Sequence, residues 1–277
     1  MRNFLIIPIL FIFLVSCSNS EDFDIPKISK LEKLEEHSNQ FIKGIYSYDN
    51  GIHVAIGFGI ANSIMVEGEG GNIIIDTTDD VSQAKEVLSE FQKINQNPIK
   101  AIIYTHNHGD HVFGASEFYN AQEEKPLVIA HSTTAEKVEK ILGIINPIIT
   151  LRSGKMFGTN LDDNELINVG LGPYLSAGRS SPGYIAPTLT FEKELKLEIA
   201  GHMVELYHAP GETDDQLFVW FPELSALMPG DNFYTTFPNL YTIRGTSHRD
   251  VIGWVNSIDK MRSLDPQYLF PSHTMPV

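Results

Sequence analysis

The chain has 277 residues and a formal net charge of −15, from 20 basic and 35 acidic side chains. Hydrophobic residues make up 42% of it, which is enough for a large core and excludes a disordered chain. The acidic balance argues against a nucleic-acid-binding protein. Because Cys17 is the single cysteine, an intrachain disulfide is excluded, and any metal must be held by histidine and carboxylate side chains.

The start of the chain has the pattern of a signal peptide. Arg2 precedes an apolar run at 4–15, which is shorter than the roughly 20 residues that a membrane-spanning helix needs. The run leads into Leu-Val-Ser-Cys, ending at Cys17, which resembles the lipobox of bacterial lipoproteins. A plain cleaved signal and an uncleaved anchor are the alternatives.

These features predict three parts of the chain. We expect a lipoprotein signal peptide at 1–16, a lipidated Cys17 with a polar tether at 17–40, and one folded domain at 41–277. Acyl chains on Cys17 would hold the domain on a membrane without a spanning helix. The expected location is therefore the bacterial cell envelope, facing the periplasm or the surface.

The hydrophobic pattern of residues 41–277 predicts an α/β (α+β) protein. Strands come first, then mixed helices and strands, then strands and a last helix. Residues 148–187 are rich in Gly and Pro and predict an inserted loop region, and Ser247 is expected to cap the last helix. The order favours two packed sheets with helices outside. In chain order we expect a short helix within 27–41, strands at 44–48, 53–56, 63–67 and 72–76, a helix from Asp79 or Asp80 to 94, a strand at 99–104, a helix at 111–119, a strand at 127–130, a helix at 133–145, strands at 188–191, 196–199, 202–207, 217–221 and 226–228, a helix at 247–264, and a strand at 268–270.

A dense cluster of metal-binding residue types follows the expected buried strand at 99–104. His106 and His108 are two residues apart, so in an extended segment they project to the same side. Asp110 and His111 fall on the turn into the next helix and can face a second position nearby. Imidazole nitrogens with a few carboxylate oxygens suit zinc first, then iron or manganese.

Three more candidate ligands follow later strands. Glu212, Asp231 and His273 each stand a few residues past the end of an expected strand. Each alone is weak evidence, because a carboxylate after Pro-Gly is usually a turn residue. Together they repeat one pattern of strand, turn and ligand, which favours a site at the ends of several strands.

This set of motifs resembles the metallo-β-lactamase fold superfamily over about residues 35–277. The resemblance implies an αββα sandwich with a two-metal site along one edge of its sheets. It also implies that Asp76 steadies the ligand loop and that Asp231 bridges the metals. One Zn2+ would take His106, His108 and Glu212, and the other would take Asp110, His111 and His273.

The motif around Glu212 narrows the resemblance to one branch of the superfamily. It is usually Pro-Gly-His-Thr in the superfamily, whereas this chain has Pro-Gly-Glu-Thr at 210–213. A carboxylate there, with the segments 54–63, 102–108 and 239–245, resembles the alkylsulfatase branch, the dodecyl-sulfate-hydrolysing enzymes. The resemblance implies a two-zinc hydrolase that cleaves a small anionic alkyl sulfate ester to alcohol and sulfate with a metal-bridging hydroxide.

Charge points to further residues. Two Zn2+, three carboxylates and a hydroxide sum to zero, so another cation is needed to hold a sulfate, and Arg244 is the candidate. A surface ion pair is the alternative for Arg244. Tyr174, Tyr184 and His248 are candidate proton donors to the leaving alcohol, with ordinary packing or exposure as the alternative for each.

Two other functions stay open. One is a metallohydrolase of another ester class, such as a lactonase, phosphodiesterase or β-lactamase; the other is an inactive, truncated lipoprotein. The sequence stops four residues after His273, whereas the alkylsulfatases that it resembles continue into a dimerisation segment and a further domain. We therefore expect a domain truncated at its C-terminus with a frayed His273. A homodimer stays open although the usual dimerisation segment is absent.

Overall fold

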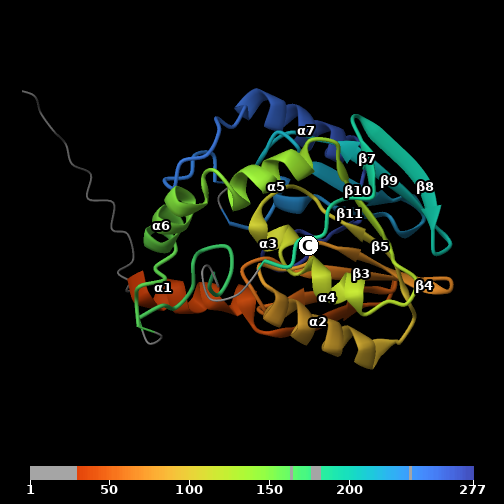
Figure 1. Ribbon diagram of the computed structural model, residues 1–277. Helices are drawn as coiled ribbons and strands as arrows, with labels where there is room; N and C mark the ends of the chain where they lie inside the picture. The colour runs from red at the N-terminus through yellow and green to blue at the C-terminus, as the bar shows by residue number, and fades with distance from the viewer. Residues whose placement is uncertain (1–29, 163–164, 176–181, 237–238) are drawn as a thin grey trace, which may run out of the picture.

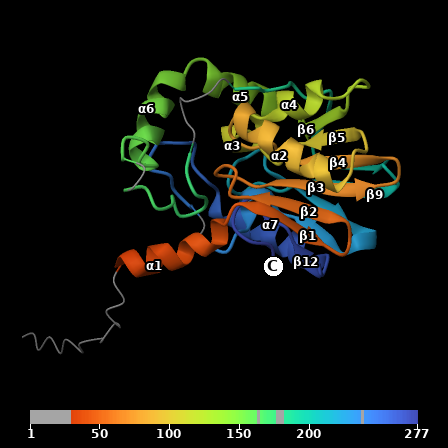
Figure 2. The ribbon, with the colours of Figure 1, turned by 90° about the horizontal axis from the view of Figure 1, so that it is seen from below.

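The computed structural model describes residues 30–162, 165–175, 182–236 and 239–277. Two sheets lie face to face at the centre and helices lie outside them, which is the expected αββα sandwich (Figures 1 and 2). The expected signal peptide, Cys17 and most of the expected tether lie outside the described residues.

The first sheet has seven strands in the order β1-β2-β3-β4-β5-β6-β7. Neighbouring strands from β1 to β4 pair antiparallel, and neighbouring strands from β4 to β7 pair parallel. Parallel strands are buried on both faces and read as continuous apolar runs, which is why the run at β5 was visible in the sequence. The strands are β1 (Gly44–Tyr48), β2 (Ile52–Ile56), β3 (Ser63–Gly68), β4 (Gly71–Ile75), β5 (Ile99–Ile103), β6 (Leu127–His131) and β7 (Leu189–Phe191).

The second sheet has five strands in the order β12-β11-β10-β9-β8. Its strands pair antiparallel except β11 and β12, which are parallel. The strands are β8 (Glu194–Ile199), β9 (His202–His208), β10 (Leu217–Phe221), β11 (Ala226–Met228) and β12 (Tyr268–Leu269).

Three apolar layers hold the sandwich together. The largest lies between the sheets, a second lies between the first sheet and the helices α2, α4 and α5, and a third lies under α7. None of the helices within the described residues is both long and apolar enough to cross a membrane. The helices are α1 (Lys30–His37), α2 (Val81–Ile94), α3 (Gly109–Val112), α4 (Ala115–Asn120), α5 (Thr134–Leu142), α6 (Asn146–Met156) and α7 (Val251–Ser263), with 3-10 turns at Ser38–Phe41, Pro222–Leu224 and Gly230–Asn232.

Two expectations about the helices are wrong. The region 148–187 is not all irregular, because α6 covers its first part. The last helix begins after Asp250 rather than Ser247: the Asp250 carboxylate accepts from the backbone N–H of Ile252 at 3.0 Å. A carboxylate at this position also complements the helix dipole.

Candidate metal centre

The fold brings the predicted ligands to one edge of the two sheets. The segment with His106 and His108 follows β5, and Asp231 and His273 follow the parallel pair β11 and β12. Since parallel strands end at the same edge, these loops converge. Gly230 permits the convergence: its φ is +59°, and a Cβ there would lie 2.1 Å from the Gln216 side chain.

The converging side chains form two adjoining clusters of ligand atoms. In each, three ligand atoms lie within 4.8 Å of one another. Asp231 also reaches the second cluster, because its Oδ2 lies 3.1 Å from His273 Nε2 and 3.4 Å from His111 Nε2. Asp231 therefore lies between the two groups. The clusters are His106, His108 and Asp231, and Asp110, His111 and His273.

Burial sets the charge of the histidines in the first cluster. It lowers the pKa of His106 well below its usual value, and it lowers the pKa of His108 to about 3, with the nearby Arg244 acting in the same direction. Both imidazoles are therefore neutral at pH 7 and carry a free lone pair. His106 Nε2 and His108 Nδ1 lie 3.0 Å apart.

The second cluster has the opposite balance. Burial lowers the pKa of His111, but the carboxylates of Asp231 and Asp110 outweigh it and raise the pKa above the usual value. The pKa of His273 is likewise raised, chiefly by Asp231 against the effect of burial. In the absence of a cation, protons on these rings balance the buried carboxylates.

The residues fit a divalent metal. His111 Nε2 and Asp231 Oδ1 are buried and have no hydrogen-bond partner among the described residues. Buried polar atoms are rarely left unpaired unless an ion or water completes them. Imidazole and carboxylate are also the ligand types that transition metals share in proteins.

Asp76 makes the contacts through which it would steady the ligand loop. Its carboxylate accepts from the backbone N–H and the hydroxyl of Thr105 at 2.8 and 2.9 Å, and from Ser272 Oγ at 2.7 Å. It also lies 2.8 Å from His111 Nδ1. Holding Nδ1 in this way aims Nε2 at the cluster.

His273 is not frayed. Its side chain is fully buried and its Nδ1 lies 2.8 Å from the carbonyl of Ile60. The amide of Asn62 donates to the carbonyls on either side of Ser272 and His273, those of Pro271 and Thr274. The residues after His273 fold back, and the backbone of Val277 pairs with Leu269 in both directions. The short tail is therefore tied to β12.

Glu212 lies beside the first cluster but is held by another residue. Its two carboxylate oxygens accept from Arg249 Nη1 and Nη2 at 2.6 and 2.5 Å, and Oε1 stays 3.7 Å from His108 Nδ1. Asp231, rather than the expected Glu212, therefore groups with His106 and His108 in this structure. Burial and Asp231 raise the pKa of Glu212 to about 7, against the effect of Arg249.

Sequence reasoning missed Arg249. It is 4% exposed and follows Arg244 by five residues. A buried carboxylate at position 212 needs a counter-charge, and that requirement is the signal that could have pointed to a second arginine.

A second buried carboxylate was also missed. Asp215 is fully buried and accepts from Asn107 Nδ2 at 2.5 Å, from Thr134 Oγ1 at 2.7 Å and from Thr213 Oγ1 at 2.8 Å. It therefore ties the ligand loop after β5 to α5. No spacing in the sequence distinguished it from Asp214.

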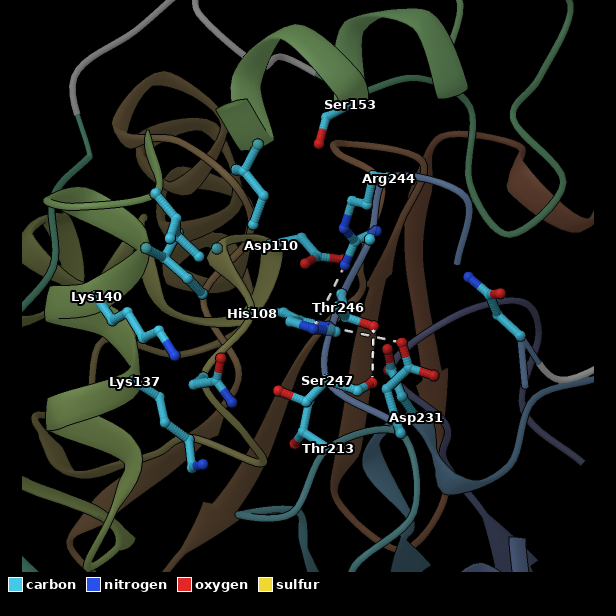
Figure 3. A pocket seen from close by; sticks show the side chains of 18 of the residues that line it. His108, Asp110, Lys137, Lys140, Ser153, Thr213, Asp231, Arg244, Thr246 and Ser247 are labelled. Atoms are coloured by element: carbon cyan, nitrogen blue, oxygen red, sulfur yellow. Dashed lines mark hydrogen bonds and ion pairs between the residues drawn. The ribbon is translucent and has the colours of Figure 1, made fainter. Parts of the chain in front are cut away.

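The clusters border a cavity of about 720 Å³. Arg244 lies in it, with Nη2 3.4 Å from His108 Nε2, between His108 and Ser153 of α6 (Figure 3). The part of the lining that comes from α5 and α6 is mixed, because Lys137, Lys140, Asn146, Thr150 and Ser153 lie beside apolar side chains. The apolar lining residues are Ile60, Phe113, Ile141, Leu142, Ile145, Ile149, Phe157, Leu171, Leu175 and Pro182.

The tyrosines expected to donate a proton lie elsewhere. Neither Tyr174 nor Tyr184 is among the described residues that line the cavity. The hydroxyl of Tyr174 donates to the carbonyl of Phe58 at 3.0 Å, and Tyr184 packs against Tyr104 with ring centroids 6.1 Å apart. His248 does line the cavity.

Comparison with known proteins decides the family. The model of the metallo-beta-lactamase superfamily matches residues 56–273, which include every predicted ligand. The chain belongs to the metallo-beta-lactamase superfamily. Membership and the two clusters together imply a divalent metal.

Within this superfamily, the chain is similar to alkylsulfatases. It is 39% identical to a linear primary-alkylsulfatase from a Pseudomonas species over 219 residues, which cover 77% of this chain and 41% of that protein. It is 27% identical to an alkyl/aryl-sulfatase from Saccharomyces cerevisiae, over 80% of this chain and 35% of that protein. The chain thus spans well under half the length of these relatives.

A solved structure shows the same fold. A stereoselective inverting sec-alkylsulfatase from a Pseudomonas species superposes with a TM-score of 0.78 at 23% identity, over 89% of this chain and 40% of that one. The two chains therefore share the fold of the sandwich.

Proposed function

We propose that this chain is a zinc-dependent hydrolase that cleaves alkyl sulfate esters to an alcohol and sulfate. The observation that carries the proposal is the cavity, in which two buried clusters of histidine and carboxylate lie beside Arg244 and apolar side chains form part of the lining. Such a cavity suits a substrate with a small anionic head and an apolar tail. The similarity to alkylsulfatases supports the same class of substrate.

Two Zn2+ fit the residues better than one. His106 and His108 would hold the first, Asp110, His111 and His273 would hold the second, and Asp231 lies where it reaches both. When bound, zinc would supply a Lewis acid for the ester oxygens and lower the pKa of a water molecule to about 7. Glu212 would become a further ligand of the first zinc if its carboxylate also contacted the metal. Its Oε1 lies 3.7 Å from His108 Nδ1.

Arg244 would bind the sulfate group. It lies in the cavity next to His108 and Asp110, and its planar guanidinium matches two sulfate oxygens at once (Figure 3). It would fix the ester over the clusters, while apolar side chains of the lining such as Ile141 and Ile149 would exclude water from the alkyl chain.

Tyr234 would protonate the leaving alcohol. It lines the cavity, and its ring centroid lies 5.6 Å from that of His273. The hydroxyl accepts from the backbone N–H of Asn239 at 3.0 Å, which leaves its own proton to donate. Burial and the charge of Glu212 raise the pKa of Tyr234, so it keeps that proton at neutral pH.

Release of inorganic sulfate from dodecyl sulfate tests the proposal. The zinc-loaded chain should release sulfate, and Arg244→Gln should lower kcat/KM by about a hundredfold, the usual loss for one charge-stabilising donor. Arg262→Gln is the matched control, since Arg262 is exposed on α7 and pairs with Asp259 away from the clusters. No release by the zinc-loaded chain, or equal losses in both variants, would contradict it.

We also propose that Cys17 carries a lipid anchor. The support is the lipobox-like sequence after an apolar run. Expression with a labelled fatty acid in a bacterial host should label the chain and not Cys17→Ser. Equal labelling of the two, or none, would contradict this part of the proposal.

A further inference from the structure

The helix α6 is apolar on two opposite sides. Ile149 and Ser153 face inward and line the cavity. Ile148 and Leu151, three residues apart on the other side, are 54% and 65% exposed, and Ile144 in the turn before the helix is 87% exposed. A surface helix normally shows a polar outer side, whereas exposed apolar side chains also lie on the outer side of this one.

The loop after residue 238 extends the same surface. Tyr241 and Ile243 are 74% and 77% exposed. The loop is joined to α6 because Arg152 Nη1 donates to the carbonyl of Arg244 at 3.4 Å and Thr242 Oγ1 lies 3.2 Å from Met156 Sδ. We call this surface the mouth face; its residues are Ile148, Leu151, Arg152, Lys155, Tyr241 and Ile243.

The mouth face is basic in an acidic chain. The stretches 140–161 and 232–249 contain no Asp or Glu, although the chain has 35 of them and a net charge of −15. Arg152 and Lys155 are exposed and lie on the same side of α6 as Leu151. Apolar side chains flanked by cations and free of carboxylates are the composition of helices that lie in an anionic lipid interface.

The mouth face also lies on the side where the chain enters the domain. Asn168 Nδ2 donates to the carbonyl of Leu34 in α1 at 3.0 Å. The helices α1 and α6 lie on the same side of the molecule in two perpendicular views (Figures 1 and 2). The sequence before α1 contains the apolar run at 4–15 and Cys17. A membrane reached by that segment would thus face this side.

We propose that the mouth face binds an anionic lipid surface. A second copy is the weaker occupant, because a two-fold dimer through this face would bring its cations against the same cations of the partner. The inference does not depend on catalysis, since lipid binding is measured without substrate.

Quenching by brominated lipids tests the proposal. The full chain with Leu151→Trp is reconstituted into vesicles of brominated phosphatidylcholine, with or without phosphatidylglycerol. The matched control is Leu127→Trp, a leucine 42% exposed at the start of β6, away from the ligand edge. Trp220 and Trp254 are buried and give a common background.

The proposal expects clear quenching at position 151 and none above background at position 127. Quenching at 151 should weaken severalfold without phosphatidylglycerol, and also in the added double change Arg152→Gln and Lys155→Gln. Equal quenching at 151 and 127, or no dependence on anionic lipid, overturns the proposal. A concentration-dependent spectral shift at 151 without vesicles would assign the face to a second copy and overturn it as well.

Discussion

At the residue scale, two buried charged side chains hold candidate ligands or their loops in place through hydrogen bonds. Asp76 accepts from the ligand loop and from the loop of His273 through Ser272, so one carboxylate fixes two ends of the centre. Arg249 holds both oxygens of Glu212. Each is buried, so neither is replaced by water without cost.

Removing Arg249 should destabilise the fold. Arg249→Met leaves the Glu212 carboxyl group buried without its partner and protonated at neutral pH, which we expect to cost about 1–3 kcal/mol of unfolding free energy. Arg249→Lys keeps the charge without the fork and should lose less. Urea denaturation measures both, with Arg262→Met as the control on an exposed site. If Arg249→Met unfolds at the same urea concentration as the control, the pair has no structural role.

The buried His108 should make the metal-free protein sensitive to acid. Its pKa is about 3 in the folded state and about 6.5 when unfolded, so the unfolded state binds more protons below pH 6.5. Its contribution to stability is therefore present above pH 6.5 and lost as the pH falls toward 3. Between pH 7 and pH 5 the stability advantage of the wild type over His108→Gln should shrink by about 2 kcal/mol. Denaturation curves at both pH values measure this, and a constant difference would contradict it.

At the scale of the element, one side-chain amide makes two of the contacts that hold the segment after β12. Asn62 is buried and donates to two carbonyls of the loop that carries His273. Thr274 has a φ of +65°, a conformation that the surrounding contacts must maintain.

Asn62→Ala should loosen that loop. It leaves two buried carbonyls without a donor, at a cost of about 1–3 kcal/mol each. Hydrogen exchange at the amides of residues 272–274 should then quicken at least tenfold, and zinc affinity should fall about tenfold through His273. Asn97→Ala, on an exposed turn, serves as the control. Unchanged exchange in Asn62→Ala would show that other contacts hold the tail.

The inner side of α6 should select for alkyl length. Ile149 lines the cavity, so Ile149→Ala removes apolar contact that only a long tail uses. We expect KM for dodecyl sulfate to rise severalfold and KM for hexyl sulfate to change little, with Ile252→Ala on α7 as the exposed control. Equal changes for both substrates would place the tail elsewhere.

At the scale of the whole molecule, the fold and the position of the site were predicted mainly from the patterns of the strands. The continuous apolar run of β5 and the ligands just past strand ends specified the sandwich and the edge where the centre lies. The helix α6 was not predicted, because it is apolar on both sides and contains Pro147 and Gly154, so its sequence shows no clear helical period. The ion pair of Glu212 and Arg249 was not predicted, because the two residues are 37 positions apart and only the fold brings them together.

Titration of the metal-free chain with zinc, followed by the sulfate released from dodecyl sulfate, tests whether the two clusters form one catalytic centre. If they do, sulfate release should rise with added zinc and level off at two ions per chain. Release that is complete without zinc, or that never appears with two ions bound, would show that they do not.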